Sequence, residues 1–393
     1  MDSKLDQIDN ILHIDTGAFF EEFWLLDAEV KTDKPDADVS HFIRLDIFSR
    51  LTGLFGYLLS GSGVSVLSFL PMGFALGWRW FVFGHHILHG GLEGYASAPG
   101  YYNRKKWGRG IRRWTTDWID CIIPDAWMKN HNVLHHYRLN EIDDPDVLED
   151  SAKFTENFPI YFRVPLVLLG ITFWKFMYFV PSIIISKNDS QEERRRINQL
   201  FEKRKWSPFH KNGFMLWTRS FIPYVTIRYG FFPLPFYMIG GSSWFINCII
   251  NLFLADIVAN LYSFGVVVTT HTGDDIYRFS DTYKTKEEYI LRSIIGSVNF
   301  RTGSTINDHA HGWLNYQIEH HIWPDLLPRA YQRVQPRLKK LCEKYEIPYV
   351  QQNVFLRIYK TLKNIFGIEK MRNIRKVEHS TPSEIDLKQG NAR

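Results

Sequence analysis

The stretch that decides the fold is Trp313-Leu314-Asn315-Tyr316-Gln317-Ile318-Glu319-His320-His321-Ile322-Trp323-Pro324. It sets two adjacent imidazoles among aromatic residues, with an amide side chain three residues before the first. On a helix Gln317, His320 and His321 lie on one face, and the two histidines point about 100° apart. The pair can serve two metal ions, or one ion from a bent helix. A lone His-His pair beside a tryptophan is more often packing, so its meaning depends on the other histidines of the chain.

A second histidine group, His85-His86-Ile87-Leu88-His89, follows directly after an apolar segment. Its three imidazoles can share one helix face, because they are spaced three and four residues apart. Three histidines at the end of an apolar helix are costly unless something binds them. This position favours metal ligation over polar packing.

A third group consists of His131, His135 and His136, which again lie on one side of a helix as an adjacent pair with a partner one turn earlier. The acidic turn Asp143-Asp144-Pro145-Asp146 follows it. Carboxylates in this place can accept hydrogen bonds from imidazole N–H groups and so fix the orientation of the rings. An ordinary solvated turn is the alternative interpretation.

One more histidine, His271, ends the last apolar stretch and is either a ligand or a satisfied polar residue. Eight nitrogen ligands are too many for one tetrahedral zinc ion and suit two metal ions. Imidazole binds zinc, copper, iron and nickel alike, so the ligand type alone does not select the metal. The candidate ligands are His85, His89, His131, His135, His136, His271, His320 and His321, and the candidates for supporting contacts are His86, Gln317, His309 and His311.

Composition indicates a multipass membrane protein with a large water-facing part. Hydrophobic residues make up 45% of the 393 residues and aromatic residues 16%, yet the mean hydropathy is −0.22, so long polar stretches must offset apolar ones. The net charge of +5, with clustered basic residues, suits a cytoplasmic membrane face. No nucleic-acid-binding module accompanies these residues. The three cysteines form no CxxC motif and indicate neither a disulfide framework nor a cysteine metal site.

The apolar segments predict about four membrane spans in two hairpins. The hairpins comprise residues 45–59 with 63–83, and residues 214–239 with 244–268, the second turning at Gly240-Gly241. Between them, residues 160–185 carry prolines and charges and precede a strongly basic segment, 187–211, so we expect a re-entrant or interfacial segment there. An even number of spans then separates the histidine groups, which puts them all on one side of the membrane.

The expected fold class is therefore an all-α membrane protein with a cytosolic, histidine-rich helical cap and interfacial helices. We expect an interfacial helix at 114–128, a helix at 285–299, a polar loop at 301–308 and a basic amphipathic helix on the membrane face at 328–345. The expected domains are a cytosolic N-terminal segment (1–42), one large domain (43–350) and a cytosolic amphipathic and polar tail (351–393).

Residues 101–113 form a basic segment with six arginines and lysines. One interpretation is a positive-inside loop that meets lipid phosphates. The other is a docking site for an acidic electron donor or for the phosphates of coenzyme A.

The segments 85–89, 131–136 and 317–321 resemble the three histidine boxes of the membrane fatty acid desaturases, and the Gln-type third box is similar to that of front-end and sphingolipid desaturases. The resemblance covers roughly residues 50–350. It implies a membrane-embedded di-iron enzyme of four spans that uses O2 and electrons from cytochrome b5 or ferredoxin. It also implies that the box histidines are ligands, and that His271 corresponds to an extra histidine near the last span.

Two features depart from the family pattern. His86 stands where many members carry Asp, and the chain has no HPGG haem motif, since His89-Gly90-Gly91 belongs to the first box. We therefore expect no fused cytochrome b5 domain and a separate electron-donor protein.

These observations lead to one main hypothesis, an O2-dependent membrane di-iron desaturase that introduces a double bond into the acyl chain of a lipid or an acyl thioester. An acyl-chain hydroxylase or a sphingoid-base desaturase on the same scaffold is the alternative. A histidine-rich metal transporter is an alternative from another class, although the histidines gather at helix ends and not along a path across the bilayer. The expected location is the endoplasmic reticulum or a bacterial inner membrane.

Overall fold

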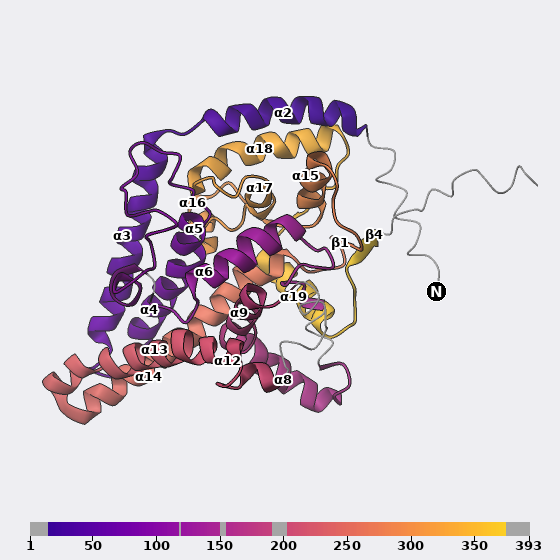
Figure 1. Ribbon diagram of the computed structural model, residues 1–393. Coiled ribbons are helices and arrows are strands. Elements are labelled where there is room, and N and C mark those ends of the chain that lie inside the picture. Colours follow the sequence, from indigo (N-terminus) through magenta and orange to yellow (C-terminus); the bar gives the residue numbers. More distant parts are fainter. Residues whose placement is uncertain (1–14, 118, 150–154, 191–202, 375–393) are drawn as a thin grey trace, which may run out of the picture.

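The computed structural model describes residues 15–117, 119–149, 155–190 and 203–374. Helices dominate this part of the chain and surround the histidine-bearing segments (Figure 1). The predicted basic segment 187–211 lies partly outside the described residues, and so does the predicted tail (351–393), of which residues 375–393 are not described.

The first two long apolar helices form the predicted hairpin. Helix α3 (Asp36–Leu59) packs along α4 (Val66–Trp78), and the chain continues through a π-helical segment, η1 (Arg79–Gly84), into α5 (His85–Leu88). The two helices approach closely at Gly56, where a Cβ atom would lie 2.4 Å from the Ser68 carbonyl oxygen. Because α3 begins at Asp36, the expected boundary between residues 42 and 43 falls inside a helix.

The second predicted hairpin is present with a more broken first arm. That arm runs through α12 (Lys211–Leu216), η8 (Trp217–Phe221), α13 (Ile222–Val225) and η9 (Thr226–Phe231), and short α11 (Lys203–Trp206) precedes it. The next helix, α14 (Leu234–Val267), contains the turn, and its part after Gly241 is the return arm, which ends in a 3-10 turn, η10 (Val268–Thr270). Gly241 interrupts α14 with φ 66°, a backbone conformation that glycine adopts without strain, at the predicted turn.

Two helices of the described chain are long and apolar enough to cross a membrane, Val66–Leu88 and Leu234–Thr270. The count rises to three if the segment between the histidine groups is one bent span. That segment comprises α8 (Ile160–Thr172), η6 (Lys175–Phe179) and α9 (Val180–Asn188), and its two parts meet at 85°. The bend agrees with the predicted re-entrant or interfacial segment.

The bend is fixed to the rest of the protein by a buried ion pair. Lys175 Nζ lies 2.8 Å from the Asp120 carboxylate, and both side chains are buried. Removing one partner from such a pair leaves an uncompensated buried charge, which costs about 3–5 kcal/mol. The pair therefore holds the bent helices against the segment that leads into the second histidine box.

The cap is built from the N-terminal helix and a late helix that run side by side at the top of Figure 1. These are α2 (Thr16–Thr32) and α18 (Pro328–Lys344). The amphipathic helix predicted here is confirmed, but its predicted position on the membrane face is wrong. Its apolar side chains, among them Tyr331 and Leu338, are buried against α2, α3 and α17 (Gln317–Ile322). The apolar stripe of a helix such as α18 indicates that this face is covered, but it does not show whether protein or membrane covers it.

Two further local predictions are wrong. The single helix expected at 114–128 is divided into η2 (Arg113–Asp117) and α6 (Pro124–Trp127), because Pro124 starts a new helix after an extended Ile123. The polar loop expected at 301–308 becomes helical as α16 (Thr305–His311), with the Ser304 hydroxyl accepting from the Asn307 N–H at its start. The helix expected at 285–299 is present as α15 (Lys286–Ile295).

Within the described part of the chain, the all-α expectation is modified by four short strands in two parallel pairs. Strand β1 (Tyr277–Phe279) pairs with β4 (Arg372–Ile374), and β2 (Asn299–Phe300) with β3 (Gln351–Gln352). With α19 (Val354–Ile365) they fasten residues 351–374 to the body of the protein.

Candidate metal centre

Helix ends and π-helical turns carry the histidines inward. His85 and His86 begin α5 directly after η1, and His131 and His135 lie on the π-helical η3 (Met128–His135), which runs into the 3-10 turn η4 (His136–Arg138). A π-helical turn shifts the phase of the side chains along a helix and is frequent at functional sites. His320 and His321 lie on α17.

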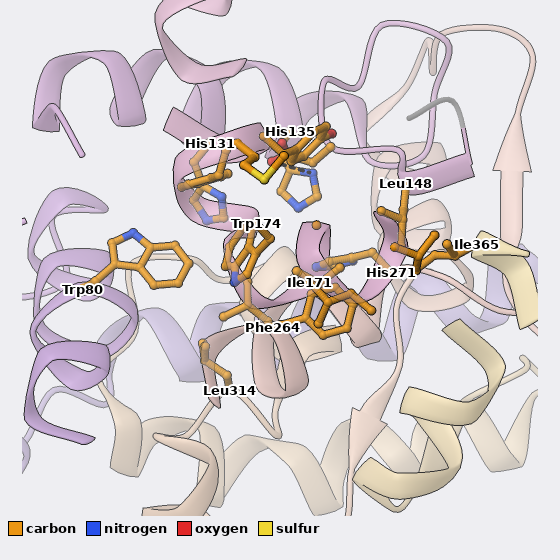
Figure 2. A pocket seen from close by; sticks show the side chains of 18 of the residues that line it. Trp80, His131, His135, Leu148, Ile171, Trp174, Phe264, His271, Leu314 and Ile365 are labelled. Atoms are coloured by element: carbon orange, nitrogen blue, oxygen red, sulfur yellow. Dashed lines mark ion pairs between the residues drawn. The ribbon is translucent and has the colours of Figure 1, made fainter. Parts of the chain in front are cut away.

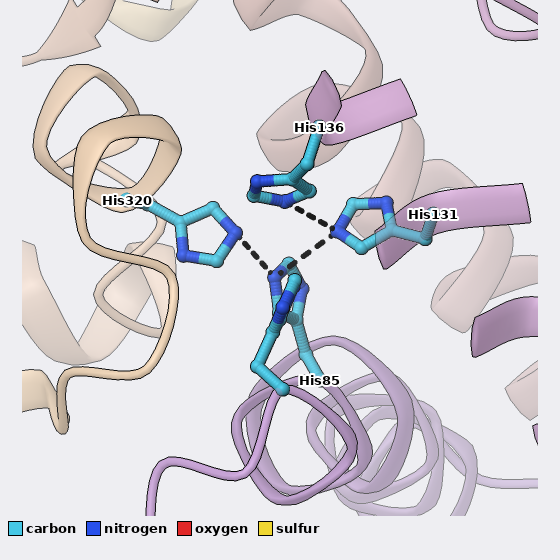
Figure 3. A group of neighbouring side chains, drawn as sticks. His85, His131, His136 and His320 are labelled. Atoms are coloured by element: carbon cyan, nitrogen blue, oxygen red, sulfur yellow. Dashed lines mark hydrogen bonds between the residues drawn. The ribbon is translucent and has the colours of Figure 1, made fainter. Parts of the chain in front are cut away.

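Five imidazoles form one compact group, which we name the five-ring group: His85, His89, His131, His136 and His320. One nitrogen from each lies within 4.8 Å of all the others. Three Nε2–Nε2 distances are short: 2.7 Å from His85 to His320, 3.3 Å from His131 to His85, and 3.1 Å from His136 to His131. Figure 3 shows these rings pointing toward a common centre.

The remaining three candidate ligands form a second group, the three-ring group: His135, His271 and His321. Their ring centroids are 4.8 Å, 4.9 Å and 5.1 Å apart. The Gln317 amide nitrogen lies 3.0 Å from Nε2 of His271. The two groups touch where the rings of His136 and His321 stack at 4.4 Å. All eight predicted ligands are thus brought together, in two groups.

The spacing of the nitrogens fits metal coordination. Ligand nitrogens about 2.1 Å from one ion are separated by about 3.0 Å at right angles and about 3.4 Å at tetrahedral angles. The short distances in the five-ring group lie near these values. Several buried nitrogens also have no hydrogen-bond partner among the described residues, including Nε2 of His89 and both ring nitrogens of His321. Buried polar atoms without a partner are costly, and a metal ion would satisfy them.

Burial keeps most of these rings neutral. It holds the pKa of His131, His136, His320 and His321 well below the usual value, and the neighbouring imidazoles lower it further. A neutral imidazole presents the lone pair that a metal ion needs. His135 differs, because its burial is outweighed by the Asp144 carboxylate, which raises the pKa of this ring.

Buried acceptors fix the orientation of two rings. His135 Nδ1 donates to Asp144 Oδ1 at 3.0 Å, which confirms that the acidic turn supports a histidine. The Tyr331 hydroxyl donates to the Trp323 carbonyl oxygen and therefore accepts from His320 Nδ1, at 3.0 Å in each case. Both contacts leave Nε2 free to bind a metal, as second contacts to metal-bound histidines commonly do.

Three histidines considered for supporting contacts lie outside both groups. His86 donates from Nδ1 to the Val82 carbonyl oxygen. His309 and His311 donate to the carbonyl oxygens of Thr305 and Asn307 within α16. Gln317, by contrast, reaches His271 directly.

Sequence reasoning missed Arg357 of α19, which supports the loop of His271. Its buried guanidinium donates to the carbonyl oxygens of Thr269 and Thr272 and pairs with Asp275 at 2.6 Å. It also missed Glu319, a buried carboxylate that accepts from Asn299 and Tyr349, each at 2.7 Å. No pattern in the sequence pointed to either residue, because Arg357 lies in the expected tail and Glu319 lies inside the histidine motif.

A cavity of about 200 Å³ opens beside the rings (Figure 2). Its wall includes His85, His131, His135, His271 and Gln317. The rest is mostly apolar and aromatic and comes largely from the bent helix pair, including Ile171, Trp174, Met177 and Phe179, with Phe264 and Leu314 opposite. A narrow apolar space thus ends at the histidine groups.

The fold and site define a helical protein with apolar helices able to span a membrane and a buried histidine cluster able to hold metal. The fatty acid desaturase model matches residues 63–353, and the chain belongs to the fatty acid desaturase family.

Among curated proteins, the chain is similar to the NADPH-dependent stearoyl-CoA 9-desaturase of Mycobacterium tuberculosis, with 23% identity over 72% of this chain and 62% of the relative. It is also similar to the probable Delta(5) fatty acid desaturase C of Dictyostelium discoideum, with 22% identity over 71% of this chain and 59% of the relative. A third relative is the Delta(8)-fatty-acid desaturase of Helianthus annuus, with 25% identity over 63% of this chain and 52% of the relative. The chain thus spans roughly half to three fifths of the length of these relatives.

Proposed function

We propose that this protein is an O2-dependent desaturase that introduces a double bond into the acyl chain of a lipid or an acyl thioester, with two irons held by the eight histidines. The observation that carries the proposal is the convergence of eight imidazoles, all buried except the half-buried His271, in two groups beside an apolar cavity. Family membership supports the same chemistry.

The five-ring group and the three-ring group would each hold one iron. Two bound irons would supply the reduction of O2 and the cleavage of unactivated C–H bonds, which no side chain can perform. The chain itself keeps most of the imidazoles neutral by burial, and it orients His135 and His320 through Asp144 and Tyr331. The apolar wall of the cavity excludes water and determines which methylene carbons approach the rings.

Substrate class, electron supply and membrane follow from the same proposal. The relatives are named for a stearoyl-CoA substrate and for desaturation at the Delta(5) and Delta(8) positions, which supports an acyl chain on coenzyme A or on a lipid. The proposed topology has four spans, with α3 and the arm 211–231 added to the two most apolar helices. A separate protein, cytochrome b5 or a ferredoxin, would supply electrons, and the membrane would be the endoplasmic reticulum or a bacterial inner membrane.

Hydroxylation of the acyl chain and desaturation of a sphingoid base need the same site. The products separate them, because a hydroxylase adds an oxygen atom to the chain whereas a desaturase removes two hydrogens.

Expression in a host that lacks polyunsaturated lipids, followed by mass spectrometry of total lipids, tests the proposal. We expect new acyl chains that are two mass units lighter, and we expect His135→Ala and His320→Ala to abolish them. The proposal is lost if either variant keeps wild-type unsaturation while accumulating to the same level in the membrane. A product sixteen mass units heavier would identify a hydroxylase.

A further inference from the structure

A second cavity, of about 430 Å³, lies among α3, α4, η2, η9 and α14 and shares no wall residue with the cavity at the histidine rings. One part of its wall is apolar and includes Leu54, Met72 and Phe232. Another part is formed by Arg50, Arg79 and the two threonines Thr115 and Thr116. From Arg50 the wall follows α3 to Tyr57, a distance of about 10 Å along the helix. The wall of the cavity thus has one apolar and one polar part, which suits an amphiphilic ligand.

The polar part carries an excess of positive charge. Arg50 Nε lies 2.9 Å from Asp46, and Arg79 pairs with the other oxygen of the same carboxylate, so two guanidinium groups share one negative charge. Asp117 also lines the cavity, and its carboxylate is paired with Arg112 at 3.2 Å, so it does not cancel the charge of Arg50 and Arg79. The Arg50 side chain is 34% exposed and so remains accessible to a ligand. Basic pockets between membrane helices bind anionic lipid head groups.

Two buried donors in the wall have no partner among the described residues. Ser49 is fully buried, and its hydroxyl makes no hydrogen bond. Arg228 is 5% exposed and pairs with Asp256 through Nη2 at 2.6 Å, but its Nε–H is left over. Unsatisfied buried donors are rare in folded proteins, and each calls for an acceptor.

We propose that this cavity binds one anionic glycerophospholipid that is not the substrate. Its phosphate lies against Arg50 and Arg79, and its ester carbonyl oxygens accept hydrogen bonds from Ser49 and Arg228. One acyl chain follows the apolar wall along α3 and α4. A free fatty acid would offer only one polar group to these two sets of donors, and a lipid without net charge would leave the cationic excess unmatched.

Substitution of Thr115 can change the charge of the polar part of the cavity wall and little else. Its side chain is exposed, and its hydroxyl donates a hydrogen bond to the Ile111 carbonyl oxygen four residues earlier, so Thr115→Glu introduces a negative charge without disturbing the core. Thr115→Gln has the same size and no charge and is the matched control. We expect about fivefold weaker binding of an anionic lipid to Thr115→Glu, as for one charge near a membrane surface.

The experiment is native mass spectrometry of the purified full chain in detergent, with added phosphatidylglycerol, phosphatidylcholine or oleate. We expect one phosphatidylglycerol per chain in the wild type and in Thr115→Gln, weaker retention in Thr115→Glu, and weaker binding of the other two probes. Ile171→Trp, which fills the cavity at the histidine rings, should not change this binding. If Thr115→Glu does not fold, Arg50→Gln replaces it.

Equal binding of the three probes, or equal retention of phosphatidylglycerol by the two Thr115 variants, would overturn the proposal. So would loss of the lipid in Ile171→Trp, because the lipid would then occupy the cavity at the rings. None of these outcomes depends on desaturase activity.

Discussion

The five-ring group and the three-ring group are neighbours with different designs. In the five-ring group the ring nitrogens approach one another directly, with Nε2–Nε2 distances of 2.7–3.3 Å, and the Tyr331 hydroxyl supports His320 from outside. The three-ring group is held from outside, by the Asp144 carboxylate on His135 and the Gln317 amide beside His271. The first group resembles a nearly filled coordination sphere, and the second resembles an incomplete one.

This difference indicates where the reaction takes place. Five imidazoles leave little room around a six-coordinate ion, whereas three protein ligands leave the open positions typical of irons that react with O2. The cavity wall does not distinguish the groups, because it includes His85 and His131 of the five-ring group as well as His135 and His271 of the three-ring group. The open coordination positions distinguish them. We therefore expect O2 and the substrate chain to meet at the three-ring group.

Removing one imidazole from each group should have the largest effect and tests whether the two groups differ in how they bind metal. His321→Ala leaves two imidazoles in the three-ring group, so we expect the loss of one iron and a fall in desaturation of more than about 100-fold. His89→Ala leaves four imidazoles in the five-ring group, so we expect both irons to remain when iron is supplied in excess. Iron and protein are quantified on the same purified samples. Equal iron loss in the two variants would contradict the difference between the groups.

Weakening the outer support of the three-ring group should have a smaller effect. Asp144→Asn replaces the carboxylate that accepts from His135 with a neutral amide, and we expect metal affinity to fall about 10–100-fold. The measurement is iron retained during titration with a chelator. The control is Asp125→Asn, which removes an exposed carboxylate from α6, just before the segment that carries His131 and His135. It should retain iron like the wild type. Unchanged retention in Asp144→Asn would show that His135 needs no such support.

Narrowing the cavity should affect turnover and not metal. Ile171→Trp places a large ring in the apolar wall, and we expect kcat/KM for long acyl chains to fall about 10-fold, in the range of the 1–3 kcal/mol that a fitted apolar contact contributes. Leu168→Trp, on the exposed face of the same helix and 57% exposed, is the control and should leave turnover unchanged. If the two variants behave alike, the cavity does not accommodate the chain.

The histidines that come together could be predicted from the sequence better than the arrangement of the helices around them. The spacing within the three histidine boxes predicted seven of the eight rings, because helical periodicity places them on one face whatever the surrounding fold is. The eighth, His271, was predicted from its position at the end of the last apolar stretch. The sequence did not predict the division of the rings into five and three, which depends on the π-helical turns before His85 and through His131. Nor did it predict α18 as a buried cover, since its amphipathic pattern is satisfied equally by protein and by membrane.

Long-range contacts were also beyond the sequence. Arg357, which supports the loop of His271, lies 88 residues after Thr269, whose carbonyl oxygen it binds. Lys175 lies 55 residues after its ion-pair partner Asp120. Such pairs follow from the path of the whole chain, and a single arginine or lysine in a sequence gives no sign of its distant partner.

We propose that these imidazoles hold two irons, one in each group. Elemental analysis by mass spectrometry of the full-length protein, purified without chelators from iron-supplied cells, tests it most directly. We expect about two irons per chain in the wild type and about one in His321→Ala. A single bound zinc per chain, with no iron in any preparation, would contradict it and would favour a metal-handling protein over an oxidase.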